Sequence, residues 1–291
     1  MYQIHNNIFR LSISEFGAEL EELCVKDINI LWKRNSLWKN QSPILFPIIG
    51  NLKDGYFIYQ GKKYELDAHG FLQHQVFEVE NHTSDSITFS SKSTEDTLKM
   101  YPFHYKFLIT YKLICNRVLI SFEIQNLGND LMYFSIGFHP GFDYEGIKHL
   151  LGENVELNFK NQNVKTIFFN PKYINKIEEK RIDSTISLSN FSKELIQQRT
   201  LCYGLNQVDI QANSNILRIQ HNMPFTAFWQ SEPENPQFLC VEPWYGLPDE
   251  EQSNHQLIDK KYIQIIQAKN TFKTQIEVDF LEGEYNANNK M

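Results

Sequence analysis

The sequence predicts an all-β protein that folds as one large antiparallel β-sandwich. Short runs in which apolar and polar residues alternate recur along the chain, which is the pattern of half-buried strands. Turn-forming residues separate these runs, and helix signals are scarce. No linker, low-complexity tract or fixed-period repeat divides the 291 residues, so we expect a single domain over residues 1–291.

Strand signals follow one another from the N-terminus to residue 280. Residues 56–66 predict a hairpin that turns at Gln60-Gly61, and the runs on either side of Cys115-Asn116 predict an antiparallel pair. Residues 150–200 carry further short runs. The clearest predicted strand regions are, in chain order, residues 3–14, 18–31 with a break at Lys26-Asp27, 56–66, 76–80, 86–90, 107–113, 117–125, 131–138, 208–220, 225–230, 238–241 and 271–280.

Helix signals are confined to two short segments. The run from Ser93 to Asp96 predicts a helix start, and this helix must end before Tyr101-Pro102 because proline disfavours a helical residue before it. Residues 192–198 predict one helical turn. Residues 32–41 read as an aromatic loop, and two prolines with two glycines exclude a regular helix over residues 42–57. We therefore expect few and short helices.

Composition limits the possible partners. The net charge is −7 and no block of five basic residues occurs, so we expect neither nucleic acid nor a membrane as a partner. No signal peptide or membrane-spanning run is recognisable, and we expect a cytoplasmic protein. The cysteines have apolar neighbours and no CxxC spacing, which favours buried free thiols over disulfides or metal ligands. They are Cys24, Cys115, Cys202 and Cys240.

The stretch Pro236–Gly246 contains a carboxylate in an unusual place. The apolar run Phe238–Val241 ends at Glu242, and Pro243 and Trp244 follow. A buried carboxylate without a partner is costly, so a carboxylate at a strand end indicates a functional base. The alternative for this stretch alone is a solvated strand end with a tryptophan in the core.

Two of the nine histidines, His69 and His139, stand out. Each ends an extended stretch, has phenylalanine neighbours and is followed by Gly or Pro-Gly. Singly, each is explained as a hydrogen-bonded structural histidine. Together with Glu242 they supply two groups that titrate near neutrality and one carboxylate, which is what general acid–base catalysis requires.

Other chemistries find little support in the sequence. His69 and His74 have the wrong spacing for a zinc site, and no HExxH motif is present. The sequence also lacks a GxSxG nucleophile motif, a GxGxxG motif and a complete phosphate-binding loop. We therefore expect no metal and no cofactor. The polar residues after Ile49, among them Asn51 and Lys53, lie on a pocket rim or in a turn at Asp54-Gly55.

Six segments together resemble the aldose 1-epimerase, or galactose mutarotase-like, family, and within it the LacX-like branch. The resemblance runs from roughly residue 3 to residue 280, and SIGFHPGF together with CVEPWYGLPD is its most specific part. The segments are GAEL (17–20), SPILFPIIGNLKDGYF (42–57), HGF (69–71), YPFHYKF (101–107), SIGFHPGF (135–142) and CVEPWYGLPD (240–249).

The resemblance implies a large antiparallel β-supersandwich with a sugar cleft, and a cofactor-independent aldose 1-epimerase acting on a hexose such as galactose or glucose. It implies that Glu242 is the general base for the anomeric hydroxyl and that His139 is the general acid for the ring oxygen. It also implies that His69 binds or polarises the sugar. Trp244 offers an aromatic surface for the apolar face of the sugar.

The chain departs from the family pattern at two positions. Asn51, with Lys53 nearby, stands where many relatives have an arginine, and Arg199 stands where relatives often have a hydroxyl-binding aspartate. We assign all three residues to substrate binding. Arg199 and Lys53 leave open a hexose-6-phosphate epimerase, and Asn51 with Arg199 leaves open a non-catalytic sugar-binding module. The identity of the sugar, and whether the protein is a monomer or a homodimer, also stay open.

Overall fold

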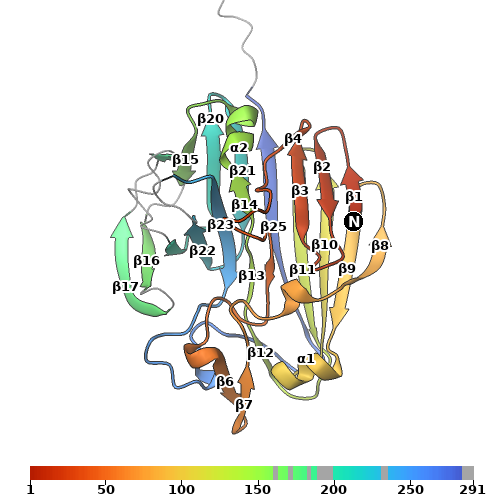
Figure 1. The fold of residues 1–291 in the computed structure, drawn as a ribbon, viewed down its shortest axis with the longest axis vertical. Helices are drawn as coiled ribbons and strands as arrows, with labels where there is room; N and C mark the ends of the chain where they lie inside the picture. Colours follow the sequence, from red (N-terminus) through yellow and green to blue (C-terminus); the bar gives the residue numbers. More distant parts are fainter. Residues whose placement is uncertain (160–162, 170–172, 182–184, 189–198, 231–234, 284–291) are drawn as a thin grey trace, which may run out of the picture.

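The computed structural model describes residues 1–159, 163–169, 173–181, 185–188, 199–230 and 235–283. Strands predominate among these residues, so the predicted all-β fold is confirmed. Figure 1 shows long strands that run along the molecule, with the small β6–β7 hairpin (Tyr56–Tyr59 and Lys62–Glu65) at its lower end. The helical turn predicted for residues 192–198 lies outside the described residues.

One large antiparallel sheet has nine strands. Its longest pair places Phe107 opposite Ile124 and Tyr111 opposite Ile120, and buried residues alternate with more exposed ones along both strands. This alternation is why the sequence predicts the pair. In order across the sheet the strands are β18 (Thr185–Ser187), β15 (Glu156–Phe159), β20 (Gln207–Ala212), β21 (Asn215–His221), β25 (Thr271–Leu281), β11 (Arg117–Asn126), β10 (Tyr105–Ile114), β9 (Ser86–Lys92) and β8 (Glu78–His82).

The second large sheet contains β23, the strand that ends in the EPWY segment. β22 pairs with β23 and places Ala227 opposite Glu242, while β13 pairs with its other side and places Gly137 opposite Trp244. The strands in order are β17 (Ile174–Arg181), β16 (Asn163–Phe169), β19 (Arg199–Tyr203), β22 (Phe225–Trp229), β23 (Phe238–Tyr245), β13 (Ile136–Phe138) and β5 (Ile44–Leu45), and β14 (Gly141–Asp143) also pairs with β23.

Smaller sheets complete the fold. Two predicted turns are confirmed, because Lys26 and Asp27, and likewise Gln60 and Gly61, have the positive φ angles that tight hairpin turns need. A four-stranded sheet holds β1 (Tyr2–His5), β2 (Phe9–Ile13), β3 (Leu20–Val25) and β4 (Ile28–Asn29), and a two-stranded sheet holds β12 (Met132–Phe134) and β24 (Gln264–Ile266).

The core lies between the two large sheets. Val118 and Ile120 of the nine-stranded sheet share one small internal space with Phe138 and Val241 of the eight-stranded sheet. Across this layer the ring of Phe138 lies 6.2 Å from that of Phe122. Fully burying a side chain of this kind contributes about 1.5–3 kcal/mol, so the apolar inner faces hold the two sheets together.

The predicted helix after residue 93 is confirmed as α1 (Glu95–Met100). Thr94 and Thr97 form a reciprocal capping pair at its start, and it ends before Tyr101. Three 3₁₀ turns also occur among the described residues: η1 (Lys53–Gly55), η2 (Leu72–His74) and η3 (Leu257–Asp259).

A second helix, α2 (Tyr144–Leu151), is not predicted by the sequence reading. The Asp143 carboxylate accepts the Gly146 N–H at 2.8 Å and so caps the helix, which contacts β4 and β14 and buries Ile147 and Leu151. The helical spacing of apolar residues is present in this segment. It covers barely two turns and includes a glycine, so it does not predict a helix. No helix of the described chain is both long and apolar enough to cross a membrane.

The structure corrects two further expectations. Cys115 is exposed, not buried, because it occupies the β10–β11 turn with a φ of 52°. Cys24, Cys202 and Cys240 are buried free thiols, as predicted. The predicted strand over residues 131–138 divides at Ser135, whose N–H donates to Pro47 O at 2.7 Å, and its halves β12 and β13 join different sheets.

Candidate active site

A cavity of about 230 Å³ collects five of the predicted site residues. Its wall is mainly aromatic and amide-bearing, and Glu242 supplies the single carboxylate among the described residues that line it. The lining residues are Trp38, Asn40, Pro43, Gly50, Asn51, His69, Gln73, His139, Trp229, Glu242, Trp244 and Pro248.

Glu242 and His139 form the polar centre of this cavity. Glu242 lies in β23, and His139 follows directly on β13, the neighbouring strand, with its N–H held by Pro43 O at 3.0 Å. His139 Nε2 lies 3.2 Å from Glu242 Oε2, and the side chains are 10% and 2% exposed. A buried carboxylate beside an imidazole can share one proton with it, which places a base and an acid side by side.

His69 approaches the same point from a different segment. The Gly50 N–H donates to His69 Nδ1 at 3.1 Å, so in the neutral ring the proton is on Nε2. The His69 ring lies 5.7 Å from the His139 ring, at 82° to it. His69 therefore presents an N–H donor beside the Glu242–His139 pair.

The backbone around His69 explains the His-Gly-Phe sequence. His69 has a φ of 67°, and its N–H donates to Gly50 O at 2.9 Å. Gly70 follows with a φ of 71°, and a Cβ there would overlap Phe46 O. Only glycine fits at the second position, because the backbones of residues 46 and 70 touch.

Two tryptophans that the sequence reading did not single out enclose the pair. The Trp38 ring lies 5.0 Å from the His139 ring, and the Trp229 ring lies 5.7 Å from it. Trp38 belongs to the predicted aromatic loop, and Trp229 ends β22. Asn40 and Gln73, also missed, lie on the lining with Asn40 Nδ2 3.4 Å from Gln73 Oε1. These amides offer donors and acceptors to hydroxyl groups.

Lys53 lies off the cavity lining, whereas the assignment of Arg199 to substrate binding stays a prediction. The Lys53 amine donates to Ser253 O at 3.3 Å, and Lys53 is not part of the cavity lining. Arg199 begins β19 and pairs with Trp229 through the backbone, but its side chain lies outside the described part of the chain. Asn51 and Trp244 are both on the lining.

A buried ion pair supports the rim next to Asn51. Asp249 accepts the Lys53 N–H at 2.9 Å, pairs with the Lys260 amine, and donates its own N–H to Asn51 O at 3.0 Å. Both charged side chains are only 5% exposed, and burial lowers the pKa of Lys260. Asp249 thus ties the chain after β23 to the segment that carries Asn51.

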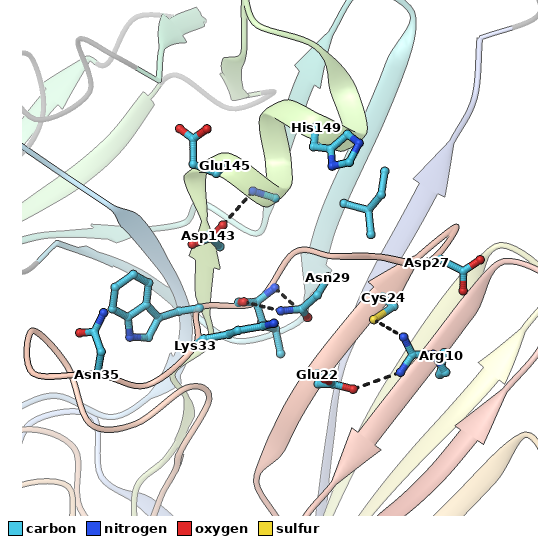
Figure 2. Close-up of a pocket in the computed structure, with 14 residues that line it drawn as sticks. Arg10, Glu22, Cys24, Asp27, Asn29, Lys33, Asn35, Asp143, Glu145 and His149 are labelled. Atoms are coloured by element: carbon cyan, nitrogen blue, oxygen red, sulfur yellow. Dashed lines mark hydrogen bonds and ion pairs between the residues drawn. The ribbon is translucent and has the colours of Figure 1, made fainter.

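A larger cavity, of about 640 Å³, lies elsewhere, between the β2–β4 strands and α2 (Figure 2). Several of its polar groups contact one another or the backbone. Arg10 donates to Glu22 and to Cys24 Sγ, both at 3.1 Å, and Asp143 accepts the Gly146 N–H. None of the predicted site residues lies on it. The smaller cavity over β23 is therefore the candidate active site.

Comparison with known proteins defines the class. The sequence profile described as Aldose 1-epimerase matches residues 1–257, so the chain belongs to the aldose 1-epimerase family. It is 24% identical over 301 residues to the plasmid-encoded protein LacX of Lactococcus lactis subsp. lactis, an alignment covering 96% of this chain and 99% of that one.

Solved structures show the same fold. A galactose mutarotase related enzyme from Lactobacillus acidophilus has 29% identity and a TM-score of 0.87, with 97% of each chain covered. A galactose mutarotase-like protein from Lactobacillus casei ATCC 334 has 23% identity and a TM-score of 0.87, with 97% of this chain and 100% of the other covered. The predicted galactose-mutarotase type of β-supersandwich is therefore confirmed.

Proposed function

We propose that the protein is a cofactor-independent aldose 1-epimerase that interconverts the α and β anomers of a neutral hexose such as galactose or glucose. The observation that carries this proposal is the buried Glu242–His139 contact of 3.2 Å in a cavity that His69 also faces. Membership of the aldose 1-epimerase family supports it.

The reaction needs one base and one acid. Glu242 takes the proton of the anomeric hydroxyl while His139, in its protonated form, donates a proton to the ring oxygen, and the C1–O5 bond opens to give the free aldehyde. Rotation about C1–C2 and the reverse proton transfers close the ring as the other anomer. Each such proton transfer contributes about 10²–10⁴ in rate. The Nε2–H of His69 donates to a sugar oxygen and holds the ring.

The lining also supports an uncharged substrate. Among the described residues that line the cavity none is Lys or Arg, and the Lys53 amine is engaged by Ser253 O. Charge-assisted hydrogen bonds from such cations to a phosphate are roughly twice as strong as neutral ones, so their absence from the described lining favours an uncharged sugar. The tryptophans Trp38, Trp229 and Trp244 instead offer flat surfaces to the C–H faces of a sugar ring. Hexose-6-phosphate epimerisation and sugar binding without catalysis are the competing functions.

The first test follows the anomers of freshly dissolved α-D-galactose and α-D-glucose by polarimetry or NMR. We expect the wild-type protein to accelerate mutarotation and Glu242→Gln to lose at least about 10²-fold in rate, because the amide cannot accept the proton. Glu123→Gln, which changes a carboxylate on β11, is the matched control and keeps full activity. Wild-type rates in Glu242→Gln would exclude this base.

The same assay separates the competing functions. Galactose and glucose 6-phosphates are run beside the free sugars, and calorimetry measures binding to each. A higher kcat/KM on a phosphorylated sugar would favour the hexose-6-phosphate epimerase. Sugar binding without any acceleration would favour the non-catalytic module.

A further inference from the structure

We propose that His139, Cys240 and Glu242 form a binding site for a thiophilic divalent cation, with Zn²⁺ as its probe, and that the bound cation reversibly blocks the sugar cavity. A ring nitrogen of His139, Sγ of Cys240 and a carboxylate oxygen of Glu242 all lie within 4.8 Å of one another. All three residues are buried.

Strand geometry explains why three residues from two segments meet. Cys240 and Glu242 are two apart in β23, and side chains two apart on a strand project from the same face of the sheet. His139 follows β13, which pairs with β23, and so reaches the same face from the neighbouring position. The sequence spacing alone hides this set, because 100 residues separate His139 from its partners.

The distances are close to those that zinc needs. With bonds of about 2.3 Å to sulfur and about 2.0–2.2 Å to nitrogen and oxygen, the ligand atoms of a tetrahedral zinc lie roughly 3.3–3.7 Å apart. His139 Nε2 and Glu242 Oε2 are already 3.2 Å apart. Sulfur at up to 4.8 Å has to move inward by about 1 Å, and we expect the Cys240 side chain to rotate by this small amount when the cation binds.

The ligand set also matches the charge and softness of such a cation. When the cation binds, the S–H bond of Cys240 breaks, its proton leaves to solvent and a metal–sulfur bond forms; any proton on the ligating nitrogen of His139 leaves as well. The thiolate and the Glu242 carboxylate then neutralise the two positive charges. Sulfur ligation selects Zn²⁺ or Co²⁺ over Mg²⁺ and Ca²⁺, which prefer oxygen.

The residues around the three ligands favour entry of the cation from the cavity over β23. His139 and Glu242 line the cavity, so a cation enters there and keeps an open coordination position toward it. Behind the site Cys240 packs with Trp32 and Phe238, against which Trp38 and Trp229 also pack. This apolar layer lowers the local dielectric and strengthens the attraction between the cation and its anionic ligands.

The inhibitory part of the inference rests on the proposed function, whereas cation binding does not. A cation on Glu242 and His139 occupies the lone pairs that the proposed base and acid use. Zn²⁺ should therefore inhibit mutarotation in competition with the sugar. Mg²⁺ should not, since it lacks affinity for the thiolate.

The binding test uses Co²⁺ as a spectroscopic substitute for Zn²⁺, in a Cys115→Ala background that removes the exposed thiol. We expect a thiolate-to-cobalt charge-transfer band in the near ultraviolet that Zn²⁺ abolishes, and its loss in Cys240→Ala. Cys202→Ala, which removes another fully buried thiol on β19, is the matched control and retains the band. Cys240→Ser preserves the side-chain volume should Cys240→Ala fail to fold.

The activity test measures Zn²⁺ inhibition of the same variants. We expect Cys240→Ala to keep the basal mutarotation rate and to need at least tenfold more Zn²⁺ for half-inhibition. A charge-transfer band that survives in both Cys240 variants, or no band in the wild type, would overturn the site. Equal Zn²⁺ inhibition with and without Cys240 would overturn its role as a ligand. If the protein has no mutarotase activity, the cobalt spectra still decide whether the cation binds.

Discussion

His69 illustrates how one side chain depends on an unusual backbone conformation. Its left-handed φ and the Gly50 N–H fix both the direction of the ring and the nitrogen that carries the proton. In the proposed reaction this proton holds a sugar oxygen. The role therefore depends on a donor at one position and not on the charge of the residue.

Substitution His69→Asn tests this dependence. Asparagine tolerates the left-handed backbone, but its shorter side chain withdraws the donor from the cavity. Losing a neutral hydrogen bond of about 0.5–1.5 kcal/mol predicts a kcat/KM for mutarotation about 2–13-fold lower. His74→Asn, at an exposed histidine five residues away, should change neither activity nor melting temperature. Equal activity in the two variants would remove His69 from the site.

His221 gives a pH dependence of stability. It is buried, its Nδ1 accepts the Met223 N–H at 3.2 Å, and its Nε2 lies 2.8 Å from Thr226 Oγ1. Burial lowers the pKa of His221 from 6.5 to about 4. Between these values the unfolded chain binds a proton that the folded chain does not, so stability falls as the pH falls, by up to about 3 kcal/mol in total.

The measurement is the free energy of unfolding in urea from pH 7 to pH 4. We expect His221→Gln to flatten the decline over this range, although it lowers stability at pH 7. His104→Gln, at an exposed histidine, should leave the pH profile unchanged. A parallel decline in wild type and His221→Gln would show that other groups cause it.

At the scale of elements, hydrogen bonds of Asp249, a member of a buried charge pair, fasten the segment after β23 to the segment after β5. Asp249 contacts Lys260, the Lys53 N–H and Asn51 O, and Gly50 in turn orients His69. Removing one buried partner leaves the other charge without compensation, which costs about 3–5 kcal/mol. Lys260→Met should therefore destabilise strongly, and Asp249→Asn/Lys260→Met should recover part of the loss.

Kinetic measurements show whether the Asp249–Lys260 pair positions the cavity rim or only stabilises the fold. Because Asp249 connects to the rim, Lys260→Met should raise the KM for the sugar and lower kcat even well below its melting temperature. Asp209 and Arg218 form a comparable pair between β20 and β21, with contacts of 2.8 and 2.7 Å, away from the cavity. Arg218→Met should lower stability and leave KM unchanged. Unaltered kinetics in Lys260→Met would limit this pair to a structural role.

At the scale of the whole molecule, local periodicity made the fold predictable. Strands such as β10 and β11 bury one face and leave the other more exposed. Apolar and polar residues therefore alternate with a period of two in their sequences. Helix α2 was not predicted because its apolar helical pattern is short and is interrupted by Gly146. Cys115 was misplaced because apolar neighbours do not show that a residue stands in a turn.

The candidate site was predictable only in part. His139 and Glu242 lie in SIGFHPGF and CVEPWYGLPD, the segments most specific for the family, so the resemblance identifies both residues. Trp229 and Gln73 come from unremarkable stretches, and only the folded chain brings them to one cavity. Lys53 turns away because Asp249 and Ser253, about 200 positions further along the chain, hold it. Contacts over such separations leave no local pattern.

Because of where the tryptophans lie, binding of a sugar should be detectable through the intrinsic fluorescence of the whole protein. Trp38, Trp229 and Trp244 line the cavity, so three of the four tryptophans meet any sugar bound there. A sugar that replaces water against three indole rings should change the intrinsic fluorescence in a saturable way. Glu242→Gln permits the titration without turnover, and Trp38→Phe should reduce the signal.

Sorbitol, an acyclic polyol that cannot form a pyranose ring, is the control ligand for this titration, and we expect little change with it. The Kd obtained for galactose or glucose should agree with calorimetry on the same variant. Fluorescence that stays constant while calorimetry reports binding would place the sugar away from these three tryptophans. The cavity over β23 could then not be the sugar site, and the functions assigned to Glu242 and His139 would fail together, because both residues line this cavity.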